Sequence, residues 1–159
     1  MSRRELLILI AALILALLAG CGGDDDPEQR VRAFVDQVAA SAEARAWNDF
    51  DAYLADGYSD SRGLTRRETL GVVTRYILAH RSIHVFQRVR RLEVRDSRHA
   101  RAVVLAALAG SPVNGPDDLA RLNADIYRFE IELADEGEGF RVTSAAWQPV
   151  GVEALLTPD

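Results

Sequence analysis

The sequence predicts an α+β fold in which three N-terminal helices pack on one face of a four-stranded antiparallel sheet. Apolar residues recur at helical spacing in three segments of the first half of the chain. Four later segments are rich in Val, Ile, Leu and aromatic residues, a composition typical of strands. Short stretches of turn-forming residues separate these later segments, which favours antiparallel hairpins.

The first predicted helix begins at Pro27. Asp26 can cap the free backbone amides, proline suits the first helical position, and Gln29 stands three residues after the cap. An apolar stripe then predicts helix to about Ala46, and its members are Val31, Phe34, Val35, Val38 and Ala42.

The second predicted helix is short. Asn48 can cap its start, and Gly57 can end it. Phe50 and Tyr53 supply its apolar surface. The residues that follow, Tyr58–Gly63, are polar enough to predict a loop.

The third predicted helix opens with a capping box. Thr65 and Glu68 have the spacing at which each side chain bonds the backbone amide of the other residue. The helix is expected to end near His80, and its buried stripe consists of Leu70, Val73 and Ile77.

The second half of the chain predicts four strands, which are His84–Val94, His99–Ala109, Leu122–Ala134 and Gly139–Pro149. Turn-forming residues at 95–97 and 135–138 join the first pair and the last pair. The middle connection, residues 110–118, is longer, and Pro116 can start one helical turn there.

This order of elements resembles the nuclear transport factor 2-like superfamily, also described as SnoaL-like or as the cystatin-like α+β cone. The resemblance covers residues 27–150, and the segments that carry it are 47–58, 63–68, 124–129 and 140–147. It implies a strongly curved sheet wrapped around a helix, with a pocket at the open end of the cone. By analogy with relatives, it also makes a homodimer through the sheet plausible.

A different signal stands at the start of the chain. Arg3 and Arg4 precede an apolar run, residues 6–18, that is too short to span a bilayer core easily. The run ends in Leu18-Ala19-Gly20-Cys21, which resembles the lipobox of bacterial lipoproteins. The resemblance implies that residues 1–20 are a signal peptide and that Cys21 carries lipid. The alternative is a free or buried cysteine after an uncleaved anchor.

These signals divide the chain into a signal peptide (1–20), a lipidated tether (21–26), a cone domain (27–150) and a C-terminal tail (151–159). The lipid would attach the protein to a membrane of the cell envelope, facing the periplasm. Gly22, rather than Asp, follows the cysteine, and by resemblance this favours the outer membrane over the inner membrane.

Composition limits the partners. Without Arg3, Arg4 and Glu5 the chain has 17 basic and 23 acidic residues, a net charge of −6, which argues against a nucleic-acid partner. Cys21 is the only cysteine, so lipidation would leave no thiol for a metal or nucleophile. The chain has no phosphate loop, nucleophile elbow or dinucleotide fingerprint, so no cofactor is expected.

Asp125 is the main candidate for acid-base chemistry. Strand alternation puts it on the same face as Tyr127 and Phe129, which predicts an inward carboxylate near the start of the strand. A carboxylate there is costly unless it is paired or solvated. It is either a pocket acid or base of raised pKa, or a strand-edge residue paired with an arginine or a loop amide.

His84 and several aromatic residues complete the candidate site. His84 or Tyr127 could donate a hydrogen bond beside Asp125, although neither matches a motif of the superfamily's enzymes. The aromatic residues could line an apolar pocket or simply form the core. The predicted pocket consists of Trp47, Tyr58, Tyr76, Phe86, Asp125, Tyr127 and Trp147.

Two functions follow from these observations. The first is a non-enzymatic lipoprotein whose cone binds a small apolar molecule or acts as a protein-interaction unit. The alternative is an isomerase, dehydratase or cyclase with Asp125 as base and Tyr127 or His84 as donor. An exposed Asp125 would argue against the enzyme, which requires these groups to converge in one cavity.

Overall fold

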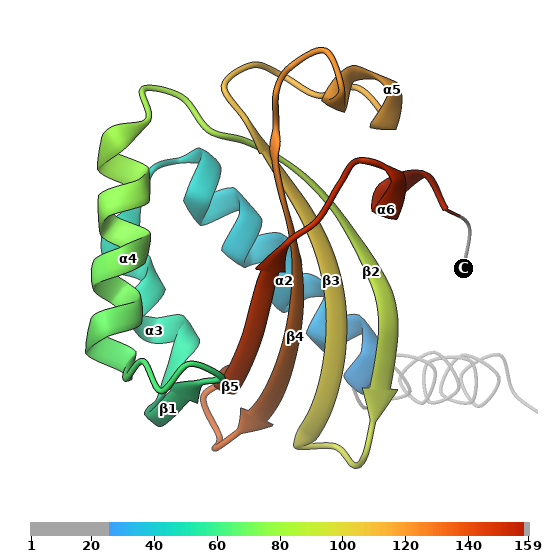
Figure 1. Ribbon diagram of the computed structural model, residues 1–159. Helices are drawn as coiled ribbons and strands as arrows, with labels where there is room; N and C mark the ends of the chain where they lie inside the picture. Colours follow the sequence, from blue (N-terminus) through green and yellow to red (C-terminus); the bar gives the residue numbers. More distant parts are fainter. Residues whose placement is uncertain (1–25, 158–159) are drawn as a thin grey trace, which may run out of the picture.

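The computed structural model describes residues 26–157 (Figure 1). The predicted signal peptide and Cys21 lie outside the described residues. The helices are α2 (Pro27–Glu43), the 3-10 helix η1 (Trp47–Asp49), α3 (Phe50–Tyr53), α4 (Arg66–Ala79), α5 (Pro116–Leu119) and α6 (Glu153–Leu156). The strands are β1 (Leu54–Asp60), β2 (His84–Val94), β3 (His99–Ala109), β4 (Asp125–Asp135) and β5 (Phe140–Pro149).

The predicted α+β class is confirmed, but the element count is wrong. Within residues 26–157 there are five α-helices and five strands, in the sheet order β1-β5-β4-β3-β2. The additional strand, β1, pairs in parallel with β5. The predicted second helix therefore ends at Tyr53, and residues predicted as its end and as a loop form this strand. Its partner lies far along the chain, so local sequence signals favoured a turn at Gly57 instead.

The predicted starts of the first and third helices are confirmed, but the predicted cap at Asn48 is wrong, because Asn48 lies inside η1 and no side chain caps η1 or α3. The Asp26 side chain accepts a hydrogen bond of 3.1 Å from the backbone N–H of Glu28. Thr65 and Glu68 form the reciprocal capping box at the start of α4. The first helix ends at Glu43, before the predicted end at Ala46, because Arg45 adopts a left-handed φ of 56°.

The four strands β2 to β5 form an antiparallel meander, as predicted. Strand β4 starts at Asp125 rather than Leu122, because Asn123 has a left-handed φ of 47° that interrupts the extended chain. A bulge between Val89 and Arg91 shifts the register of β2. The shift allows both Val89 and Leu92 to contact the inner core.

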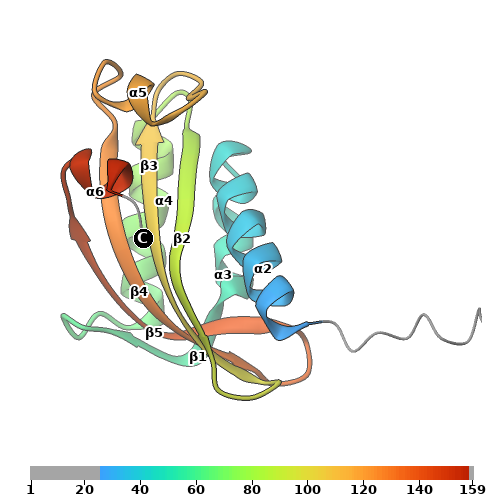
Figure 2. The ribbon, with the colours of Figure 1, turned by 90° about the vertical axis from the view of Figure 1, so that its right-hand side faces the viewer.

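The sheet has an apolar cluster on each face. On the inner face, α2 and α3 pack on β3, β4 and β5 through residues such as Val31, Phe34 and Leu133. On the outer face, α5 and α6 cover a second cluster that includes Leu119 and Leu155. Figure 2 shows α2 and α6 on opposite sides of the curved strands.

The segment expected to be a C-terminal tail therefore contains α6, which contributes a fully buried Leu155 to the outer cluster. The Arg88 guanidinium donates to the Leu155 carbonyl at 3.3 Å, and Arg90 donates to the Ala154 carbonyl at 2.5 Å. These contacts attach α6 to β2. None of the helices in residues 26–157 is both long and apolar enough to cross a membrane.

Candidate functional site

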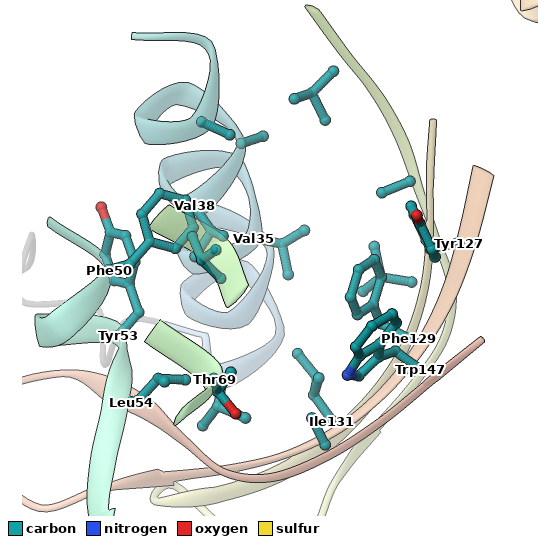
Figure 3. A pocket seen from close by; sticks show the side chains of 18 of the residues that line it. Val35, Val38, Phe50, Tyr53, Leu54, Thr69, Tyr127, Phe129, Ile131 and Trp147 are labelled. Carbon is teal, nitrogen blue, oxygen red and sulfur yellow. The ribbon is translucent and has the colours of Figure 1, made fainter. Parts of the chain in front are cut away.

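A cavity of about 330 Å³ lies between the helices and the inner face of the sheet (Figure 3). This volume is within the range of roughly 300–1,000 Å³ that is usual for small-molecule pockets. Helix α2 contributes Val35 and Val38, and α4 contributes Val72 and Val73. The sheet contributes its inward side chains, among them Val104, Ala106, Phe129 and Ile131.

The lining of the cavity is almost entirely apolar. It contains no Asp, Glu, His, Lys, Arg or Cys side chain. The lining residues that carry a polar side-chain atom are Tyr53, Tyr58, Thr69, Tyr76, Gln87, Tyr127 and Trp147. Three of these are bonded to residues outside the lining. The Tyr53 hydroxyl bonds Ser41 at 2.7 Å, the Gln87 amide donates to Asp36 at 2.8 Å, and the Tyr76 hydroxyl donates to Asp125. The surface suits an uncharged, mostly apolar ligand.

A side-chain hydrogen bond between α4 and β4 lies at one end of the cavity. The Tyr76 hydroxyl donates to Asp125 Oδ2 at 3.1 Å. The Tyr76 ring stacks on His80 with a centroid distance of 4.2 Å. Burial is the main cause that raises the pKa of Tyr76, and its hydrogen bond to Asp125 and the charges of Asp125 and Tyr127 raise it further. Tyr76 is therefore a protonated donor at neutral pH.

Tyr127 and Trp147 form one wall of the cavity. Their rings make an edge contact with a centroid distance of 5.8 Å. The Arg62 guanidinium lies 3.8 Å from the centre of the Trp147 ring and donates to the Trp147 carbonyl at 2.9 Å. Burial, followed by the charge of Asp125, raises the pKa of Tyr127. This wall thus presents aromatic surface and a protonated phenol.

Tyr58 and Thr69 line the other end of the cavity, and Asp60 lies near Tyr58 but outside the lining. Burial is the main cause that raises the Tyr58 pKa; a hydrogen bond with the Thr69 hydroxyl lowers it, and the Asp60 charge raises it. Asp60 is 6% exposed, and its Oδ1 accepts 2.8 Å hydrogen bonds from the backbone N–H groups of Arg62 and Leu64. Its Oδ2 is buried without a hydrogen-bond partner, and the Thr69 hydroxyl oxygen is likewise buried, out of contact with the open space of the cavity.

Some of the residues predicted for the pocket line the cavity. These are Tyr58, Tyr76, Tyr127 and Trp147. The inner-face alternation predicted for Tyr127, Phe129 and Ile131 also holds, because all three line the cavity.

The other predicted pocket residues lie elsewhere. Asp125 is exposed and bonds Tyr76, not Tyr127, His84 or an arginine. Trp47 is 42% exposed on η1. Phe86 packs in the outer cluster, and His84 shares its side of β2, because the intervening Val85 and the following Gln87 face the cavity. The sequence predicted that residues of β2 alternate between the two faces of the sheet, but it assigned the wrong set of them to the cavity.

Sequence reasoning missed Asp60 and Thr69. Asp60 lay in a segment predicted as a loop, where aspartate is common and uninformative. Thr69 falls between the capping box and the apolar stripe of α4, and nothing in the helical period distinguishes it from a surface threonine. Within the described part of the chain, no group of three or more His, Cys, Asp or Glu side chains could hold a metal ion.

Solved structures share this architecture. The chain is 15% identical to a proposed dehydratase of the nuclear transport factor 2-like family from Streptomyces avermitilis, with a TM-score of 0.61 over 78% of this chain and 96% of that chain. It is 13% identical to a cystatin-like domain of unknown function from Nostoc punctiforme, with a TM-score of 0.58 over 81% of each chain. A proposed scytalone dehydratase from Novosphingobium aromaticivorans gives 10% identity and a TM-score of 0.59 over 78% of this chain and 84% of that one.

No protein-family model and no curated protein matches the chain in sequence. At these identities the structural likeness defines the fold and nothing finer. The domain therefore has the α+β cone fold of nuclear transport factor 2-like and cystatin-like proteins.

Proposed function

We propose that this chain is a lipid-anchored protein of the bacterial cell envelope whose cone domain binds a small apolar molecule without transforming it. The observation that carries the proposal is the cavity of about 330 Å³, whose lining has apolar and aromatic side chains and no ionisable group other than tyrosine. Burial of apolar ligand surface would supply most of the affinity, and the few polar atoms would orient the ligand.

Binding is favoured over the acid-base alternative by the positions of its three candidate residues. An isomerase, dehydratase or cyclase needs a base that faces the substrate. Asp125 is exposed and bonded to Tyr76, and His84 belongs to the side of β2 opposite the cavity. Tyr127 alone lines the cavity, and its raised pKa keeps the phenol protonated. The likeness to two proposed dehydratases is a likeness of fold.

The membrane attachment in this proposal depends on Cys21. A diacylglyceryl thioether and an acylated amine together would hold the protein stably, whereas one chain would not. The tether, residues 21–26, would allow the domain to move at most about 20 Å from the lipid. By the lipobox resemblance we propose the periplasmic side, and the outer membrane ahead of the inner membrane.

A homodimer is a further element of the proposal. The outer face that α5 and α6 leave uncovered carries Arg101, which pairs with Glu130 at 3.1 Å and with Glu132 at 3.7 Å. A sheet-to-sheet homodimer would use this charged surface. Sedimentation velocity tests it: a dimer is expected, and a monomer at high protein concentration would refute this element alone.

The ligand proposal is tested by native mass spectrometry of protein purified from its own membrane. We expect the lipidated chain to carry an additional, non-covalent small molecule that gentle activation removes. Lipidated chain with an empty cavity throughout the preparation would contradict the proposal.

The anchor is tested with Cys21→Ala. The variant is expected to lose the lipid mass and to leave the membrane fraction, because no acyl chain remains to hold it. A variant that stays embedded would identify the first apolar segment as a spanning helix and refute the proposed attachment.

A further inference from the structure

The carboxylate of Asp125 lies where the cavity meets solvent. In the antiparallel register of β3 and β4, Asp125 stands directly opposite Leu108, and residues opposite each other share one face of a sheet. Tyr127, two residues further along β4, shares that face as well. Both of these neighbours line the cavity, and so does Tyr76, which bonds the carboxylate. Because Asp125 itself is exposed, its carboxylate stands at the rim of the cavity.

The rim carries a negative charge that no cation of the described chain neutralises. The other acidic residues of β4, which are Glu130, Glu132 and Asp135, all form ion pairs with arginines. Within residues 26–157 Asp125 forms no ion pair, and its one hydrogen bond is the bond from the Tyr76 hydroxyl. The rim of an otherwise apolar cavity is therefore selective for positive charge.

Acceptor oxygens converge at this rim. The Tyr76 hydroxyl occupies Asp125 Oδ2, so in residues 26–157 Asp125 Oδ1 and the Tyr127 hydroxyl have no hydrogen-bond partner. Burial and, after it, the Asp125 charge raise the pKa of Tyr127, which places the carboxylate near the phenol. Figure 3 shows the Tyr127 hydroxyl at the end of the sheet wall remote from Ile131.

The chemistry of these oxygens favours an ammonium group over a metal ion. An ammonium group has three N–H donors and no acceptor, so it complements a carboxylate and a phenol oxygen. Divalent cations in proteins take several carboxylate or carbonyl ligands, and this rim has one carboxylate.

We propose that Asp125 and Tyr127 bind the protonated amino group of a ligand whose apolar body occupies the cavity. The inference rests on the proposed function and names the class of ligand, an amphipathic primary amine. The ammonium group would donate to Asp125 Oδ1 and to the Tyr127 hydroxyl oxygen, and its third N–H would stay in water. The apolar body would lie along Ala106 and Phe129. A ligand carboxylate at the same place would be repelled by Asp125.

Isothermal titration calorimetry of the full chain with three matched probes tests the amine site. The probes are 2-naphthylmethylamine, 2-naphthylmethanol and 2-naphthoate, which share one apolar body and carry a cation, a neutral hydroxyl and an anion. The amine is expected to bind roughly tenfold more tightly than the alcohol, the effect of one hydrogen bond to a charged group at a solvated rim. The carboxylate is expected to bind more weakly than the alcohol.

Asp125→Asn removes the charge and keeps an acceptor oxygen for the Tyr76 hydroxyl. The variant should bind the alcohol as the parent chain does and lose most of the preference for the amine. Glu136→Gln is the matched control, because it removes one negative charge from an exposed position past the opposite end of β4. It should keep the preference, which separates Asp125 from the general attraction of an acidic chain for cations.

The outcomes separate the amine site from the proposed function. Equal binding of the amine and the alcohol by the parent chain would overturn the amine site and leave the apolar cavity in place. An unchanged preference in Asp125→Asn, or an equal loss in Glu136→Gln, would overturn the assignment to Asp125. Binding of 2-naphthoate as tight as that of the amine would overturn the selectivity for positive charge. No binding of any probe would overturn both the amine site and the proposed function.

Discussion

Two neighbouring alanines on β3 provide the sharpest test of the cavity. Ala106 points into it, whereas Ala107 points into the outer cluster, where it is 0% exposed. Substituting leucine at either position adds the same three carbon atoms to the same strand. The two variants differ only in whether there is space to receive the larger side chain.

The expected magnitudes follow from that difference. At about 0.8 kcal/mol for each buried methylene, Ala106→Leu gains at most roughly 2.4 kcal/mol. Fixing the new side chain costs about 0.5–1 kcal/mol, so the net change is about 1–2 kcal/mol in favour of the folded state. Ala107→Leu has no cavity to fill and should destabilise the fold by about 1–3 kcal/mol through overpacking.

Urea unfolding measures both changes in the free energy of unfolding, and calorimetry with naphthalene measures the effect on binding. Ala106→Leu should weaken naphthalene binding at least tenfold, because the leucine occupies part of the ligand space. If Ala106→Leu destabilises the protein as much as Ala107→Leu does, the inner face is already closely packed and the reasoning is refuted.

Three further predictions concern stability. Asp60→Ala should lower the free energy of unfolding, measured in urea, by about 2–3 kcal/mol, because the N–H groups of Arg62 and Leu64 lose their acceptor. Asp60→Asn keeps an acceptor oxygen and should lower the free energy of unfolding by less. Equal losses in the two variants would refute the role of Asp60 as acceptor for these N–H groups. Leu155→Ala should cost about 2–5 kcal/mol, since the side chain is fully buried, and a cost below 1 kcal/mol would show that α6 does not pack on the sheet. The raised pKa of Tyr76 contributes stability that is present below pH of about 10 and is lost as pH rises beyond it. Tyr76→Phe should therefore flatten the alkaline decline of stability, and an unchanged decline would contradict that contribution.

Much of the fold could be predicted from local signals. The capping box at Thr65 and the proline at Pro27 predict where two helices begin. They can be recognised in the sequence because a cap involves residues of a single turn. The bounds of β2 and β3 also follow from composition and turn residues. Strand β1 could not be predicted in this way, because its pairing with β5 joins segments more than 80 residues apart. That parallel pairing leaves no local pattern around Gly57.

The site was only partly predictable for the same kind of reason. Alternation correctly grouped Tyr127 with Phe129 on the cavity side, but it could not decide which parity of β2 faces inward. His84 and Phe86 were therefore assigned to the wrong face. The sequence does not distinguish Asp60 from a loop aspartate. The structure shows that its carboxylate is buried where β1 lies against α4. A buried polar atom without a partner is a property of packing and has no sequence pattern of its own.

The most direct test of the central claim is methyl NMR of the full chain titrated with 2-naphthol. If the cavity binds an apolar molecule, shift changes should concentrate on inner-face methyls such as those of Val104 and Ile131. The methyls of Leu105 and Leu155, in the outer cluster, should stay unchanged. Shifts centred on the outer cluster, or no shifts at saturating 2-naphthol, would contradict the account.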